Sequence, residues 1–574
     1  MMNKKKIWFF TIGIVVFAFI GLIILFGLVK NKLSLITNVE KNIDLITSLK
    51  DINENFLTEY NVNSQRSLDV LHYNISIELL QEQRKIKGDV TLKIKVVNPN
   101  EDKITLNFYD NLKINSVFLD TKEAKYDRTK TNISIYPVNK ISDTLYVRLI
   151  YEGEPKSLGF GSFNFDEING RKLIYTLNEP VFASTWFPCV DLPDDKAMAD
   201  IYITNDSSFV SLSNGKLIGS TLNGSKRTYH WKTYYPISTY LIAIYSGFYK
   251  SYSQKYVSIS KDTVALYCYA LPEKFEDAVR DFKGHEKYLK IFEEIFGSYP
   301  FAKEKYSITQ FNWSYGAMEH QTITGIGTNF ISGRKLFQDM MIHELAHQWW
   351  GNAVGPKTWK DIWLNEGFST YSEALYWEKQ SGYDALKTTL MAKVNSFNNG
   401  TLYNPLSNLF SSLVYDKGAW VLHMLRKEVG DSTFFKIIRN YYDRFKYKNA
   451  STRDFQKIAQ EISKKNLNDF FDQWVFKGTG IIEANFDYYT EKTNNNLYST
   501  RITIKQLQNG YDIYKFPIEI KIVYDNQNEI RNFYITKREE IFTFESIKKP
   551  VEIIVDPNKW LLANFETNKL NDDR

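Results

Sequence analysis

The feature that most constrains this chain is a pair of histidines four residues apart in an apolar run. His343 and His347 belong to the stretch Met341-Ile-His-Glu-Leu-Ala-His-Gln-Trp-Trp350, and the run 335–350 reads as a helix. Residues at this spacing share one helix face, so both imidazoles are able to bind one metal ion. Glu344 follows the first histidine, close enough to polarise a water on that metal without being a ligand itself.

A catalytic zinc site needs a third protein ligand and one open position. The candidate is Glu366 in Trp363-Leu-Asn-Glu-Gly-Phe368, with 18 residues between it and His347. Those residues hold a Gly-Asn break at 351–352, a proline-containing loop and the start of a second helix, which is a plausible return path to the metal. Only 7 of the 574 residues are histidine, so a chance match is a poor explanation. The sequence predicts one Zn²⁺ per chain, although cobalt or manganese would accept the same ligands.

Length and composition bound the organisation of the chain. Its 574 residues exceed one hydrophobic core, so we expect roughly two to four domains. The net charge of +6, without a dense basic block, gives no reason to expect nucleic acid as a partner. Two cysteines, Cys189 and Cys268, exclude a disulfide framework and a cysteine-built zinc site. A single bridge between them stays open, as does burial of both as small hydrophobic residues.

The amino terminus has the pattern of a membrane anchor. Lys4, Lys5 and Lys6 precede an uncharged, mostly apolar run over 7–29, which as a helix would cover about 35 Å. Signal peptides have shorter apolar cores, of about 7–15 residues, so we expect an uncleaved single-pass anchor in residues 1–30. The lysine bias slightly favours an amino terminus inside and the remaining chain outside the cytoplasm.

Residues 31–65 carry apolar side chains at three- and four-residue steps, which predicts a polar stalk helix. Such a helix would either self-associate, giving a homodimer, or lie as a plain amphipathic helix on the first domain. These two alternatives are open at the level of sequence.

The rest of the chain alternates between strand and helix patterns, as in a multidomain α+β protein. Residues 66–255 read as a mostly antiparallel β domain, because apolar and polar side chains alternate through segments such as 90–96. Residues 256–480 are mainly helical and contain the metal motif. Residues 481–574 return to strands, of which 516–522 alternates cleanly and 551–555 is the last expected.

A second motif, Gly316-Ala-Met-Glu-His320, precedes the first histidine by about two dozen residues. Its small residues would let an extended substrate backbone approach and pair as an added strand, which makes Gly316, Ala317 and Met318 candidate substrate-binding residues. Glu319 would then present a carboxylate beside the metal. The alternative for a lone glutamate in a loop is a solvated surface charge.

Together these motifs resemble the gluzincin aminopeptidases, the family of alanyl aminopeptidase and leukotriene hydrolase. The segments Trp186–Lys196 and Ser298–Phe301 are similar to the family as well, and the resemblance runs from about Leu68 to the carboxyl end. It implies a saddle-like N-terminal β domain, a thermolysin-like α/β zinc domain and a small C-terminal β-sandwich. The helical domain that many members add to close the cleft is not expected in this short form.

The resemblance also implies roles for individual residues. His320 departs from the family pattern, which usually has Asn at that position. The implied zinc ligands are His343, His347 and Glu366; the general base is Glu344; the groups facing the substrate's α-amino group are Glu319 and Glu179; and Tyr415 stabilises the oxyanion.

We therefore expect a membrane-anchored zinc aminopeptidase that acts on peptides with a free amino terminus. Two carboxylates facing an ammonium would select that terminus, because burying the cation unpaired is costly. The alternatives are epoxide hydrolysis at the same zinc, and a catalytically inactive scaffold or receptor. Asp361 and Glu373 are candidates for orienting the imidazoles, although charges on a helix surface are the commoner explanation.

Overall fold

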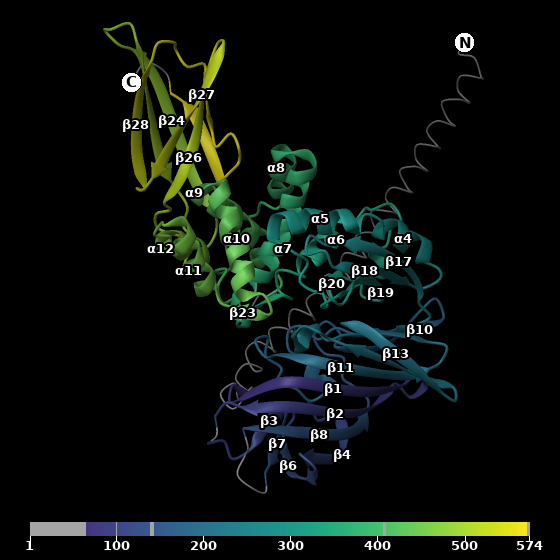
Figure 1. Ribbon diagram of the computed structural model, residues 1–574. Helices are drawn as coiled ribbons and strands as arrows, with labels where there is room; N and C mark the ends of the chain where they lie inside the picture. The colour runs from purple at the N-terminus through teal and green to yellow at the C-terminus, as the bar shows by residue number, and fades with distance from the viewer. Residues whose placement is uncertain (1–64, 99, 138–142, 406–408, 571–574) are drawn as a thin grey trace, which may run out of the picture. The chain divides into compact units, whose positions relative to one another are not determined.

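The computed structural model describes residues 65–98, 100–137, 143–405 and 409–570 (Figure 1). The chain divides into two units between Asn61 and Val62. The expected anchor, and all of the expected stalk except Gln65, lie outside the described residues. Within the described ranges, no helix is both long enough and apolar enough to cross a membrane.

The first β region is built around a nine-stranded sheet. Its strands are β1 (Leu68–Leu80), β2 (Lys85–Val96), β4 (Leu112–Leu119), β5 (Lys122–Glu123), β8 (Thr144–Gly153), β11 (Lys196–Asp206), β13 (Lys216–Asn223), β14 (Lys226–Lys232) and β15 (Ile237–Ser238). The order is β13-β14-β11-β1-β2-β8-β4-β5, with β15 paired to β11. In β2 the apolar residues Val90, Leu92 and Ile94 are fully buried, as their alternation predicts. Pairing is antiparallel apart from β1 with β11, which is parallel.

Two smaller sheets complete this region. The first has the order β3-β7-β6 and the second β12-β16-β10-β9. Their strands are β3 (Ile104–Asn107), β6 (Lys125–Arg128), β7 (Asn132–Tyr136), β9 (Phe163–Ile168), β10 (Arg171–Thr176), β12 (Val210–Ser213) and β16 (Ile244–Gly247). β10 leads into the loop that carries Glu179. Asn178 fixes this loop: its amide donates to the Ile242 carbonyl at 2.6 Å and accepts from Trp186 Nε1 at 2.9 Å.

A five-stranded sheet underlies the metal motif. Its strands are β17 (Lys250–Val257), β18 (Thr263–Ala270), β19 (Tyr306–Phe311), β20 (Ala317–Met318) and β21 (Ile323–Gly327), in the order β17-β18-β19-β21-β20. β17 spans the expected domain boundary at 255/256, so the sheet begins slightly before it. β20 forms an edge and pairs, among the described strands, with β21 alone.

Helices make up most of the chain from Phe275 to Phe471. They are α4 (Phe275–Phe282), α5 (His285–Phe296), α6 (Gln338–Ala346), α7 (Trp363–Ser381), α8 (Tyr383–Met391), α9 (Gly418–Val429), α10 (Asp431–Phe445), α11 (Thr452–Ser463) and α12 (Asn468–Phe471). β22 (Val354–Pro356) and β23 (Lys448–Ala450) form a short parallel pair between them. α6 is shorter than the run 335–350 predicted, and His347 is its C-terminal cap. The chain turns at Gly351, whose φ of +112° favours glycine.

Two sheets form the C-terminal region, as expected for a β-sandwich. Their orders are β28-β25-β24-β30 and β27-β26-β29. The strands are β24 (Ile482–Lys492), β25 (Tyr498–Gln506), β26 (Phe516–Tyr524), β27 (Gln527–Ile535), β28 (Glu539–Ser546), β29 (Glu552–Val555) and β30 (Ala563–Lys569). Phe516 of one sheet stacks on Phe565 of the other, with ring centroids 6.4 Å apart. The expectation that 551–555 is the last strand is wrong, because β30 follows and pairs in parallel with β24.

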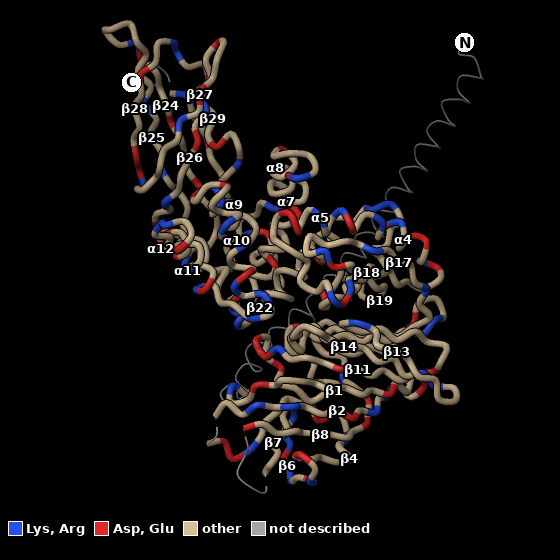
Figure 2. Tube along the Cα trace, in the orientation of Figure 1, with Lys and Arg blue, Asp and Glu red and all other residues tan. Residues whose placement is uncertain are grey.

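Charged residues of both signs are interspersed along the described trace (Figure 2). Cys189 and Cys268 are both free and buried, so the structure has no bridge between them. This agrees with the alternative in which each packs as a small hydrophobic residue.

Candidate active site

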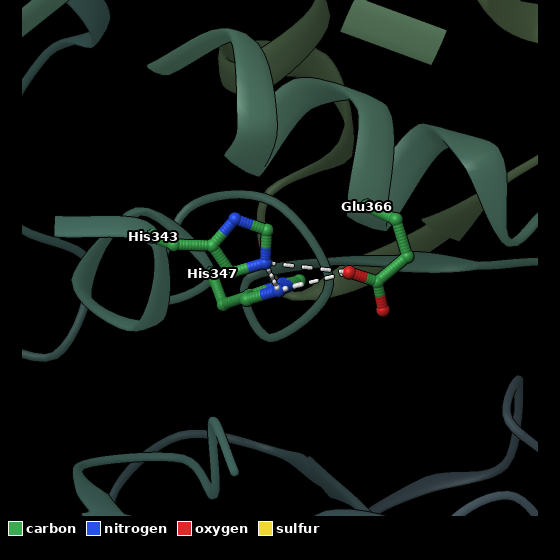
Figure 3. A group of neighbouring side chains, drawn as sticks. All are labelled: His343, His347 and Glu366. Atoms are coloured by element: carbon green, nitrogen blue, oxygen red, sulfur yellow. Dashed lines mark hydrogen bonds and ion pairs between the residues drawn. The ribbon is translucent and has the colours of Figure 1, made fainter. Parts of the chain in front are cut away.

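Helices α6 and α7 bring the three expected metal ligands together (Figure 3). Nε2 of His343 lies 3.0 Å from Nε2 of His347. Oε2 of Glu366 lies 3.4 Å from the first nitrogen and 3.3 Å from the second. Around one zinc ion, tetrahedral ligand atoms at about 2.0–2.1 Å would be separated by about 3.3 Å. The three atoms therefore already have nearly the spacing that a single zinc ion requires.

The hydrogen bonds of the two imidazoles explain why these nitrogens face each other. Nδ1 of His347 lies 2.9 Å from the Trp350 carbonyl oxygen, which only accepts, so this nitrogen donates. Nδ1 of His343 lies 2.9 Å from Oε1 of Glu373 and donates to that carboxylate. In neutral rings both Nε2 atoms then carry lone pairs. Two lone pairs and a carboxylate oxygen turned toward one another need a cation between them, so the donor set fits a metal ion.

The electrostatics of the ligand set agree with this arrangement. Burial opposes ionisation of Glu366, but when the imidazoles of His347 and His343 carry a proton, their positive charge lowers its pKa to about 2. A cation held between neutral rings would act on Glu366 in the same direction. The Glu366 side chain is thus held as a carboxylate, the form in which it would bind a cation.

Glu373, on α7, orients the first imidazole, and it is itself paired. Lys393 Nζ lies 2.9 Å from Oε2 of Glu373, whose other oxygen contacts His343. Asp361, the other candidate for this role, does not contact either histidine. It accepts instead from the backbone nitrogen and hydroxyl of Thr452, each at 2.8 Å. The expectation for Asp361 is wrong, because it lies before α7 and binds Thr452, the first residue of α11.

Replacing Glu373 with Gln should weaken zinc binding by about 10–100-fold, since the imidazole of His343 loses its charged acceptor. The measurement is zinc affinity by competition with a chromogenic chelator. Asp361→Asn is the matched control, expected to lower the melting temperature while leaving zinc affinity unchanged. Equal zinc affinities for the wild-type and Glu373→Gln proteins would contradict the orienting role.

Two further carboxylates lie beside the metal-ligand set. Oxygen atoms of Glu179, Glu319 and Glu366 lie within 4.8 Å of one another. Glu179 and Glu319 are 5% and 4% exposed, and Oε1 of each has no hydrogen-bond partner within the described residues. Burial raises the pKa of both groups, and the neighbouring carboxylate raises that of Glu179 further. Ionising both buried carboxyl groups is therefore costly, and a cation bound between them would offset that cost.

Two side-chain amides, which follow His347 in the sequence, bind the backbone of Glu319. Asn352 Nδ2 donates to the Glu319 carbonyl at 2.7 Å, and Gln348 Nε2 donates to it at 3.3 Å. Ala317 and Met318 form β20, and Gly316 precedes them at the entry to this edge strand. The candidate substrate-binding residues therefore lie along a sheet edge that ends at the buried carboxylates.

Glu344 and Tyr415 lie on two different helical elements, α6 and the π-helical turn Leu413–Lys417. Glu344 is buried, which raises its pKa, and Oε2 has no hydrogen-bond partner within the described residues. Tyr415 lies in the π-helical turn Leu413–Lys417, and its ring stacks on His343 with centroids 5.9 Å apart. Burial raises the pKa of Tyr415, so its hydroxyl remains protonated and able to donate.

A close helix crossing holds Tyr415 near Glu366. A Cβ built on Gly367 would lie 2.9 Å from the Cα of Gly418, so only glycine fits where α7 meets α9. The two glycines directly follow Glu366 and Lys417. Their contact sets the approach of the elements that carry the ligand and the tyrosine, although no local sequence signal predicts that they touch.

His320 is fully buried behind this edge. Its Nδ1 lies 2.7 Å from the hydroxyl of Tyr245, and burial lowers its pKa to about 3. The residue that departs from the family pattern is therefore a neutral, hydrogen-bonded core residue. The structure gives it no direct contact with the ligand set among the interactions of the described residues.

Comparison with protein families matches the two regions in turn. Residues 70–241 match the peptidase M1 N-terminal domain, and residues 280–474 match the peptidase family M1 domain. These matches include β1 to β11, the loop with Glu179, and both metal-motif helices.

Curated relatives are similar over most of this chain. Aminopeptidase 2, mitochondrial, of Saccharomyces cerevisiae is 28% identical over 461 residues, covering 73% of this chain and 47% of the relative. Aminopeptidase N of Lactococcus lactis is 27% identical over 435 residues, covering 70% and 50%. The chain thus spans about half the length of the curated relatives it matches.

Solved structures share the fold. Legionella pneumophila aminopeptidase A, in complex with aspartic acid, superposes with a TM-score of 0.77 at 18% identity, over 87% of this chain and 60% of that one. The M1 zinc metallopeptidase of Deinococcus radiodurans gives a TM-score of 0.60 at 24% identity, over 69% of this chain and 92% of that one.

Proposed function

Since the chain belongs to the M1 peptidase family of gluzincin aminopeptidases, we propose that it is a zinc-dependent aminopeptidase. It would hydrolyse the first peptide bond of peptides that have a free amino terminus. The observation that carries this proposal is the pair of buried carboxylates, Glu179 and Glu319, beside a three-residue metal-ligand set. An amino-terminal ammonium is the cation that this pair would accept.

The site orients a peptide by its backbone and its amine. Glu179 and Glu319 hold the ammonium, and the extended backbone adds to the free edge of β20. This places the first carbonyl group at His343, His347 and Glu366. An internal stretch of chain has no charge to offer the two carboxylates, so the enzyme selects termini.

Glu344 transfers the proton, and Tyr415 stabilises the negative charge that develops on the carbonyl oxygen. A zinc ion held by the three ligands supplies Lewis acidity, which lowers the pKa of a water and polarises the carbonyl group. Glu344 accepts the proton of the attacking water and returns it to the departing amine. Tyr415 donates a hydrogen bond to the oxygen on which negative charge develops.

Two alternative functions receive less support. Epoxide hydrolysis at the same ligand set gives the Glu179–Glu319 pair no cationic partner. An inactive scaffold or receptor would place no demand on Glu344 and Tyr415, which are both present beside the ligands.

Paired substrates test the proposal directly. Amino-acid anilides, each with its amino-terminally acetylated form, are assayed with the full chain, before and after treatment with a chelator. We expect hydrolysis of the free amines, little hydrolysis of the acetylated forms, loss of activity on chelation and recovery with zinc. Equal hydrolysis of both sets would contradict binding of the substrate ammonium by Glu179 and Glu319, which we call the ammonium pocket. Activity that survives removal of zinc would contradict a zinc-dependent reaction.

We also propose that the chain is anchored to a membrane through residues 7–29, with the catalytic region outside the cytoplasm. The support is the uncharged run itself and the lysines before it. Residues 31–65 would then form the connecting stalk, and self-association through it would make a homodimer. Carbonate extraction of membranes and protease accessibility in intact cells test the anchor and its orientation, and chemical cross-linking tests the dimer.

A further inference from the structure

One cavity, of about 490 Å³, opens directly onto the catalytic residues. Its lining includes His343, Glu344 and Tyr415 together with the aromatic residues Trp313, Tyr315 and Phe410. Neither Glu179 nor Glu319 is among the lining residues. The ammonium pocket thus lies beyond the catalytic residues, and this cavity is where the part of a peptide after the first peptide bond would lie.

Aromatic side chains from three separate parts of the chain meet at this cavity. Phe160, from the first β region, contacts Trp313 edge-on with centroids 5.7 Å apart and Phe410 with centroids 5.2 Å apart. Trp313 also lies 5.9 Å from Tyr315. We call Trp313, Tyr315 and Phe410 the aromatic wall, with Phe160 packed against two of its members. Tyr315 is 41% exposed, and the other two are half-buried.

An exposed aromatic ring such as that of Tyr315 adds little to the stability of the core, whereas aromatic rings lining a cavity bind apolar ligands well. Phe410 lies five residues before Tyr415, and Tyr315 directly precedes Gly316. Members of the wall therefore lie near, in sequence as well as in the cavity, residues proposed to hold and cleave the peptide.

The direction of the bound peptide places its next residues beside the wall. The amine lies at Glu319, just after β20, so the peptide runs antiparallel to this strand, toward Gly316. Extended residues advance by about 3.3 Å each, so the second and third residues lie beside Ala317 to Tyr315. Trp313 flanks this path, because its ring lies 3.7 Å from the position that a Cβ on Gly316 would take.

We propose that the aromatic wall is a specificity surface for the second and third residues of the peptide, favouring large apolar or aromatic side chains there. This inference rests on the proposed aminopeptidase function. The charged residues that line the cavity also favour apolar over acidic side chains at these positions. Glu373 and Asp416 also line it, and the Lys393 ammonium is paired with Glu373 at 2.9 Å. The lining therefore gives an acidic side chain no unpaired partner among these residues.

A peptide series tests the wall. All peptides share one amino-terminal residue and carry Ala, Phe or Glu at position two or three, and the amide of that first residue serves as a substrate with nothing beyond the scissile bond. We expect kcat/KM for a Phe peptide to exceed that for the Ala peptide by about tenfold, mainly through KM. The Glu peptides should be the poorest.

The variants Tyr315→Ala and Trp313→Ala should lower the ratio of kcat/KM for the Phe peptide to that for the amide by about tenfold. Tyr146→Ala is the matched control: this tyrosine is 46% exposed on β8, outside the cavity, and its loss should leave the ratio unchanged. Tyr315 is exposed, so its truncation tests the wall even if the Trp313 variant proves unstable.

Two results would overturn the proposal: equal kcat/KM for Ala and Phe peptides in the wild-type protein, or a preference for Phe that survives Tyr315→Ala and Trp313→Ala together. Either result, with the amide still hydrolysed, refutes the wall and leaves the aminopeptidase function standing. If neither the amide nor any peptide is hydrolysed by the zinc-loaded protein, the proposed function fails and the wall fails with it.

Discussion

Replacing Glu344 with Gln is expected to lower kcat by about 10²–10⁴-fold, while the protein keeps its zinc. Glutamine has nearly the same size as glutamate but is unable to accept the proton of the attacking water. Because Oε2 of Glu344 makes no hydrogen bond within the described residues, the substitution breaks no contact there. The carboxylate is also not one of the three clustered ligand atoms, so metal binding should persist.

The measurement combines turnover of an amino-acid anilide with zinc content by atomic absorption and thermal unfolding. Asp339→Asn, an exposed change on the same helix, is the matched control and should alter kcat by less than about twofold. A Glu344→Gln protein that retained a tenth of the wild-type kcat would show that another group is the base. A protein without zinc would show that Glu344 has a structural role instead.

The clustering of His343, His347 and Glu366 is the part of the site geometry that the sequence predicted most fully. Four-residue spacing places His343 and His347 on one face wherever the helix ends, so the prediction survived the shorter α6. The prediction that Glu366 lies beside the two histidines depended only on a turn of the chain at 351–352 and the start of a second helix. The positive φ of Gly351 and the start of α7 at Trp363 provide this return.

Deciding whether Asp361 or Glu373 orients a metal-binding imidazole requires the exact first residue of α7. Glu366 and Glu373 are seven residues apart, which is about two helical turns, so they share a face. Asp361 lies before the first residue of the helix and faces elsewhere. Since helix starts are among the least certain features of a sequence, both residues were reasonable candidates for the same role.

Hydrophobic periodicity in the sequence does not predict contacts between distant segments of the chain. The Gly367–Gly418 crossing and the aromatic wall each join segments whose separation no periodicity encodes. The relative direction of paired strands could not be predicted from periodicity either. Alternation identifies a half-buried strand such as β2, but it does not say that β1 and β11 run parallel or that β30 pairs with β24.

The second large effect is expected at the ammonium pocket. Glu319→Ala should lower kcat/KM for free-amine substrates by about 10²–10³-fold, because a buried cation that loses a charged partner costs about 3–5 kcal/mol. Glu179→Gln should cost less, about tenfold, since the amide oxygen still accepts a hydrogen bond from the ammonium. Both proteins should bind zinc with unchanged affinity, unlike Glu366→Gln, which removes a ligand. Zinc loss in the Glu319 variant would show that this residue supports the metal instead of the substrate.

The double variant shows whether the two carboxylates act on one cation. If both face the same ammonium, they interact through it, and the loss in the double variant should be smaller than the product of the single losses. Discrimination between free and acetylated anilides should fall in the same order, with the double variant the least selective. Fully multiplicative losses would place Glu179 and Glu319 against different groups, and the selection of amino termini would then rest on Glu319 alone.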